Sequence, residues 1–149
     1  MIPRQPPDAL DLRFPGREEE VRRALMQLRA WMKAHRFRPQ FRGDVELVLA
    51  EVLNNIVEHA LPGHLNNEVT VCGQVSEGCL SMQVSDHGSP LPGGQIPDGL
   101  HPGLDVALQD LPEGGFGWML VRQLTTDLHY SRRPGTNRLC MCFSLDLCS

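Results

Sequence analysis

Two acidic side chains and an amide recur at helical spacing near residue 50. Glu51, Asn55 and Glu58 lie at positions i, i+4 and i+7, which places them on one face of a helix. An amide oxygen is a hard ligand suited to Mg²⁺, which usually keeps several waters and bridges to phosphates. A carboxylate one turn away can accept a proton from an incoming hydroxyl. The alternative is a solvated helix face with an exposed amide, and the spacing alone leaves both interpretations open.

A second candidate group is an aspartate at a strand end. Residues 80–84 alternate between apolar and polar side chains, which predicts a half-buried strand, and Asp86 and Gly88 follow it. The aspartate is a fixed hydrogen-bond acceptor, and the glycine lets the backbone approach a flat ligand. This carboxylate could bind an exocyclic amine, although most Asp-x-Gly triplets are ordinary turns.

A glycine-rich turn forms the third candidate group. It runs directly into the helical apolar pattern of residues 118–124 and consists of Gly114, Gly115, Phe116 and Gly117. Backbone N–H groups and the positive end of a helix dipole can face phosphate at such a start. No Gly-Lys-Ser/Thr follows, so this is not a Walker loop, and the surroundings do not fit the dinucleotide fingerprint.

The order of these motifs resembles the histidine-kinase-like (GHKL, or Bergerat) ATPase superfamily. Glu-x-x-x-Asn on a helix, Asp-x-Gly after a strand and Gly-Gly-x-Gly before a helix are followed by Gly135-Thr136 before the last strand. The compact length and residues 115–127 resemble the anti-sigma-factor serine kinases more closely. The resemblance covers about residues 8 to 146.

The resemblance implies a role for each matched residue. Glu51 corresponds to the general base, Asn55 to the Mg²⁺ ligand and Asp86 to the acceptor for the adenine amine. Glu58 matches no family role and is interpreted as a solvated or structural acid. The other positions expected to contact ATP are His59 just after the Mg²⁺ ligand, Gly88 beside the base, the phosphate-holding turn Gly114, Gly115, Phe116 and Gly117, and Thr136, which closes the site.

The chain departs from the family pattern in two places. Pro90 stands where the family often has a second glycine, which stiffens the first turn of the loop. The expected ATP lid, about residues 89–113, contains no lysine or arginine, although phosphoryl transfer needs cationic stabilisation beyond the metal. Arg122, Arg132, Arg133 or a partner protein could supply that charge. ATP binding is therefore expected independently of catalysis.

Composition indicates a small single domain spanning residues 1–149. The net charge of −4 argues against non-specific nucleic-acid or membrane-surface binding. No apolar stretch is long enough to cross a membrane and the N-terminus lacks a signal-peptide core, so a cytoplasmic protein is expected. The five cysteines form no Cys-x-x-Cys pair, which favours reduced thiols over zinc ligands. The sequence contains no Gly-x-Ser-x-Gly elbow, which argues against a hydrolase.

The patterns predict an α/β (α+β) two-layer sandwich with a mixed, mostly antiparallel sheet and helices on one face. The resemblance implies that this is the Bergerat ATP-binding fold. Helices are expected over residues 18–35 and 44–60, with a connector over residues 36–43. A short helix is possible inside the lid at residues 105–110. The expected strands are residues 10–14, a hairpin of 68–75 with 79–84, and a hairpin of 128–131 with 137–145.

The leading functional hypothesis is an anti-sigma-factor-type serine/threonine protein kinase. By resemblance, it would use ATP and Mg²⁺, bind a sigma factor, phosphorylate a small STAS-type antagonist and form a homodimer. The alternative is a non-catalytic switch that binds nucleotide and captures a partner protein. A detached catalytic domain of a histidine kinase fits less well, because the sequence has no dimerising helical hairpin with a phospho-acceptor histidine.

Overall fold

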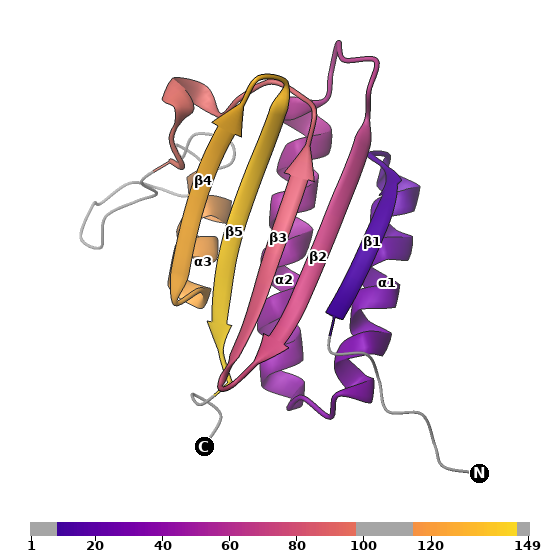
Figure 1. Ribbon diagram of the computed structural model, residues 1–149, viewed down its shortest axis with the longest axis vertical. Coiled ribbons are helices and arrows are strands. Elements are labelled where there is room, and N and C mark those ends of the chain that lie inside the picture. Colours follow the sequence, from indigo (N-terminus) through magenta and orange to yellow (C-terminus); the bar gives the residue numbers. More distant parts are fainter. Residues whose placement is uncertain (1–8, 98–114, 146–149) are drawn as a thin grey trace.

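The computed structural model describes residues 9–97 and 115–145, and within them five strands form one sheet (Figure 1). Their order in space is β1-β2-β3-β5-β4, and all four pairings are antiparallel. The predicted fold class and both hairpins are confirmed. The strands are β1 (Ala9–Pro15), β2 (Glu68–Ser76), β3 (Cys79–Asp86), β4 (Asp127–Arg133) and β5 (Thr136–Ser144).

In the part of the chain that the structure describes, three helices cover one face of this sheet: α1 (Glu18–Ala34), α2 (Pro39–Asn55) and α3 (Gly115–Leu124) (Figure 1). Alternate strand residues face the helices and are buried, whereas their neighbours on the opposite face are partly or fully exposed. The core therefore lies between the sheet and the helices. Its fully buried side chains include Leu28, Met32, Val45, Val48, Leu49, Val52, Leu53, Val69, Val71, Leu80, Met82 and Val84.

Helix α2 begins five residues before the predicted start at residue 44, so the predicted connector is wrong over residues 39–43. Pro39 occupies the first helical turn, where its missing N–H costs nothing, and Arg38 before it is extended. Phe41 is 6% exposed. The centroid of its ring lies 5.2 Å from the ring centroid of Phe37 and 6.3 Å from that of Phe143. This aromatic packing holds the early turn in helical form although Gly43 disfavours it.

The same helix widens immediately after Asn55. Residues Ile56–Ala60 form a π-helical turn, η1, and the N–H of Leu61 donates to the carbonyl of Ile56 at 3.0 Å. Such turns are rare and occur frequently at functional sites. The widening therefore lies where the sequence predicts the metal ligand.

Only the first part of the expected lid lies in the described residues. It contains a 3₁₀ turn, η2 (Pro92–Gly94), whereas the possible helix at residues 105–110 lies outside them. None of the described helices is long and apolar enough to cross a membrane.

Candidate nucleotide site

Glu51 lies directly against the first turn of α3. A Cβ atom added to Gly117 would lie 1.8 Å from Oε1 of Glu51 and 2.3 Å from its Cδ. Only glycine leaves room for the carboxylate at this point. The glycine turn and the predicted base, 66 positions apart in the sequence, are thus adjacent in space.

Asn55 carries an unpaired polar group. Its Nδ2 atom is buried and has no hydrogen-bond partner among the described residues. A buried amide without a partner is costly, so it indicates a missing ligand or neighbour. Rotating the amide by 180° would present Oδ1 at the same place. The position, one helical turn beyond Glu51, therefore fits a ligand of Mg²⁺ or of its water.

Asp86 ends β3 and is almost completely buried, with 4% of its surface exposed. Its Oδ1 atom accepts hydrogen bonds from the backbone N–H of Gly88 at 2.8 Å and from Nδ2 of Asn137 at 2.9 Å. The first bond closes a turn that fixes the backbone after the strand. The carboxylate is therefore held in one orientation.

Gly88 joins that turn to the end of the π-helical segment. A Cβ atom at this position would lie 2.2 Å from the carbonyl oxygen of Ala60, and the N–H of Ser89 donates to the same oxygen at 2.7 Å. The segments that carry Asn55 and Asp86 are thus in contact through backbone atoms. This contact sets the distance between Asn55, the expected metal ligand, and Asp86, the residue expected to bind the adenine ring.

The remaining predicted residues lie in different surroundings. The hydroxyl of Thr136 is 3.4 Å from Nδ1 of His87, not beside Asp86. His59 is exposed, and its Nε2 lies 3.7 Å from Oε2 of Glu58. Gly115 and Phe116 are the first residues of α3, and Gly114 lies outside the described residues.

Two of the three arginines considered as cation sources make hydrogen bonds beside the site. Arg122 donates to the carbonyls of Ile96 and Pro97 at 3.1 and 2.9 Å. Arg132 donates to the carbonyl of Gly88 at 2.6 Å. These hydrogen bonds hold the segment after Asp86 in place, so both arginine side chains have a structural role there. Arg133 is exposed.

The sequence reasoning missed Asn137 and Tyr130. Asn137 is 5% exposed and contacts Asp86, and the Tyr130 hydroxyl donates to it at 2.5 Å. The available signal was a polar residue at a core-facing position of β5, where Leu139, Met141 and Phe143 continue the buried face. The register pairs Asp86 with Asn137, so the neighbour of the aspartate is one residue after the predicted Thr136.

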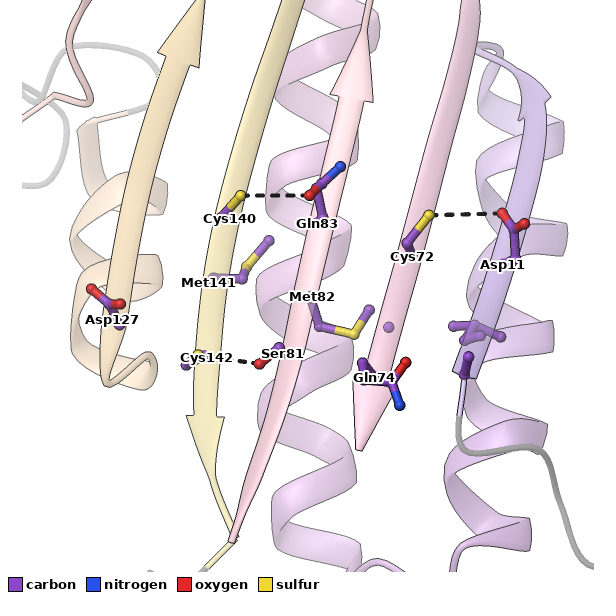
Figure 2. A pocket seen from close by; sticks show the side chains of 13 residues that line it. Asp11, Cys72, Gln74, Ser81, Met82, Gln83, Asp127, Cys140, Met141 and Cys142 are labelled. Atoms are coloured by element: carbon purple, nitrogen blue, oxygen red, sulfur yellow. Dashed lines mark hydrogen bonds between the residues drawn. The ribbon is translucent and has the colours of Figure 1, made fainter. Parts of the chain in front are cut away.

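A separate hollow of about 450 Å³ lies on the face of the sheet away from the helices (Figure 2). Asp11, Gln74, Gln83 and Asp127 contribute polar side chains, and Cys72, Cys140 and Cys142 contribute thiols. Burial raises the pKa of the Cys72 and Cys140 thiols, so both stay protonated at neutral pH. No group of three potential metal ligands occurs within residues 9–97 and 115–145. None of the predicted nucleotide-binding residues lines this hollow.

Known proteins similar to this chain were found at the level of family, sequence and structure. Residues 14–143 match the histidine kinase-like ATPase domain. The chain belongs to this family. It is 33% identical over 105 residues to the serine/threonine-protein kinase BtrW of Bordetella bronchiseptica, covering 70% of this chain and 71% of that one. It is 26% identical over 124 residues to the serine-protein kinase RsbW of Listeria innocua, covering 81% and 78% respectively.

Solved structures share the fold of this ATPase domain. The RsbU and RsbW domains of a Mycobacterium tuberculosis protein align with a TM-score of 0.67 at 14% identity, over 91% of this chain and 32% of that one. The SiaB–SiaC complex of Pseudomonas aeruginosa aligns with a TM-score of 0.63 at 17% identity, over 90% of this chain and 88% of that one. The chain thus spans about a third of the first structure and most of the second.

Proposed function

We propose that the protein is an ATP-binding serine/threonine protein kinase of the anti-sigma-factor type. The observation that carries this proposal is the contact of Glu51 with Gly117, which brings a carboxylate to the start of α3. Asn55, with its unpaired amide, lies one helical turn further along α2. A helix start rich in glycine is suited to phosphate, and a carboxylate next to it is suited to take a proton from an attacking hydroxyl. The relatives BtrW and RsbW bear the names of serine kinases, which supports the same activity here.

In the proposed reaction each group acts by position and charge. Asp86 would accept a hydrogen bond from the adenine amine, the backbone at Gly115 and Gly117 would donate to phosphate, and Asn55 would hold Mg²⁺. When bound there, Mg²⁺ would supply positive charge beside the phosphates. Glu51 would orient the substrate serine and accept its proton as the serine oxygen forms a bond to the γ-phosphorus. The bond from that phosphorus to the β–γ bridging oxygen breaks, and ADP leaves. Alignment of the reactants and charge compensation account for most of the acceleration.

The proposed protein substrate is a small STAS-type antagonist, and the proposed regulatory target is a sigma factor. Phosphorylation of the antagonist would weaken its binding and let the kinase capture the sigma factor. The proposed setting is the cytoplasm, and the proposed assembly is a homodimer. A likeness in fold to the SiaB–SiaC complex is compatible with capture of a small partner.

A second candidate is a switch that binds nucleotide but transfers no phosphate. Residues 89–113 contain no lysine or arginine, and Arg122 and Arg132 are engaged with backbone carbonyls. A switch needs no cation to stabilise a transferring phosphoryl group. The sequence of the lid favours this candidate, whereas the position of Glu51 favours the kinase.

Transfer of label from γ-³²P-ATP to the candidate antagonist separates the two functions. The parent protein should phosphorylate a serine, and Glu51→Gln should bind ATP normally while transferring about a hundredfold to ten-thousandfold more slowly, because it lacks the proton acceptor. Asn55→Ala should lose both ATP affinity and transfer. The matched controls are Glu58→Gln and Asn54→Ala, which change exposed neighbours of the same types.

The outcomes point to different accounts. A parent protein that binds ATP and the antagonist but transfers no label is a non-catalytic switch. Equal transfer by the parent and Glu51→Gln removes Glu51 as the base.

A further inference from the structure

Asn137 is a buried amide with every side of its side chain engaged. Its Nδ2 donates to Oδ1 of Asp86 at 2.9 Å and to the carbonyl of Ser89 at 2.8 Å, with the carbonyl of Gly88 at 3.4 Å. Its Oδ1 accepts from the hydroxyl of Tyr130 at 2.5 Å and from Nη1 of Arg132 at 2.9 Å. With acceptors on one side and donors on the other, only one orientation of the amide satisfies all of its neighbours.

This fixed amide determines what Asp86 can offer a ligand. Both hydrogen bonds that Asp86 accepts within the described part of the chain end on Oδ1. Oδ2 remains available as an acceptor, and the two donors on Oδ1 prevent the carboxylate from rotating. The donors of Asn137 are already used, so the pair presents an acceptor and no competing donor.

We propose that Asn137 is a positioning residue that makes the nucleotide site select bases with an exocyclic amine. The inference rests on the proposed function, in which Asp86 binds the base. Adenine presents an amine donor to Oδ2, whereas hypoxanthine presents a carbonyl at the same place. Two acceptors then face each other in a buried site, where unpaired polar groups are expensive.

Loss of Asn137 would relax this selection. Without its amide, Asp86 keeps only the bond from Gly88, so the carboxylate can turn and water can enter beside it. A water molecule can donate to a carbonyl as readily as it accepts from an amine. ATP then loses affinity while inosine triphosphate (ITP) does not.

Tyr130 provides a second, milder way to disturb the amide. Its hydroxyl donates to Asn137 and also accepts from the backbone N–H of Leu91 at 3.1 Å. Tyr130→Phe removes one of the two donors that orient Asn137 and leaves the bond from Arg132. Its effect on selection should have the same direction as that of Asn137→Ala and be smaller.

Calorimetric titration with ATP and with ITP, each with Mg²⁺, tests the proposal. The parent protein should prefer ATP by about tenfold to a hundredfold, the value of one hydrogen bond to a charged group. In Asn137→Ala the ratio of the two dissociation constants should fall below about threefold, mainly through weaker ATP binding. Tyr130→Phe should give an intermediate ratio, and Asn54→Ala, an exposed asparagine, should keep the parental ratio.

The ratio of the two dissociation constants distinguishes a positioning role of Asn137 from a purely structural one. A general loosening of the fold would weaken the binding of ATP and of ITP equally. An unchanged ratio in Asn137→Ala, or a parent that binds ATP and ITP equally well, overturns the inference while leaving the nucleotide site intact. A parent that binds neither nucleotide overturns the proposed function itself. If Asn137→Ala fails to fold, an unchanged ratio in Tyr130→Phe decides against the inference.

Discussion

At the scale of single residues, the candidate site depends on a missing side chain. Gly117 has no Cβ, and the carboxylate of Glu51 occupies the place where one would be. Sequence reasoning assigned both residues to the site but gave the glycine only a backbone role toward phosphate. The contact adds a second reason for glycine at this position, namely room for the proposed base.

Gly117→Ala should therefore impair catalysis without unfolding the protein. The added methyl group meets the flexible end of Glu51, which can move, and alanine favours the helix by about 0.5–1 kcal/mol. Stability in urea should stay within about 1 kcal/mol of the parent, while phosphate transfer falls by about a hundredfold because the base is displaced.

Gly43→Ala is the matched control for this substitution. It lies within α2, and an added Cβ meets nothing within 4 Å. This variant should gain stability and keep the parental transfer rate. Equal transfer by Gly117→Ala and the parent would contradict the assigned place of Glu51 in the reaction.

At the scale of elements, the join between η1 and the turn after β3 determines the shape of the site. The carbonyl of Ala60 accepts from the N–H of Ser89, and Gly88 packs against the same peptide group. Backbone atoms cannot move away from an added group as easily as the end of a flexible side chain can. The distance between the Asn55 and Asp86 segments is thus fixed by close backbone contact.

Gly88→Ala should destabilise the protein by about 1–3 kcal/mol, the usual cost of forcing extra atoms into a packed region. ATP affinity should fall as well, because the hydrogen bond from Gly88 N–H orients Asp86. Urea unfolding and calorimetry would measure the two effects. Parental values for both would show that the turn is free to shift.

The sequence was most informative where periodicity is strong. The strands of both hairpins and the long helices follow from apolar spacing. The roles of Glu51, Asn55 and Asp86 come from motif order and stay a prediction. The start of α2 did not follow, because Pro39 opens the helix without a polar capping side chain. The place of Asn137 depends on the register between β3 and β5, which local sequence patterns do not specify.

At the scale of the whole molecule, one face of the sheet carries the helices and the site, and the other carries thiols. Burial raises the pKa of Cys72, Cys79 and Cys140 above the ordinary value of 9.0. As pH rises, these thiols therefore lose their protons at a lower pH in the unfolded chain than in the folded protein. The contribution of these thiols to stability is complete below about pH 9 and is lost as pH rises through their folded values.

Urea unfolding at pH 7, 9 and 10.5 should show this loss. The triple variant Cys72→Ser, Cys79→Ser and Cys140→Ser should lose less stability between pH 9 and 10.5 than the parent, because serine does not titrate there. The same decline in both proteins would assign the alkaline loss to other groups.

Asp86, Asn55 and the start of α3 are proposed to form one nucleotide site. Thermal unfolding with and without ATP and Mg²⁺, for the parent and Asp86→Asn, shows whether they do. ATP at a hundred times its dissociation constant should stabilise the parent by about 2.7 kcal/mol. At that same ATP concentration, Asp86→Asn should be stabilised by only about 0.3–1.3 kcal/mol, because it loses a hydrogen bond to a charged group worth about 1.5–3 kcal/mol. No shift in the parent, or equal shifts in both proteins, would contradict the account.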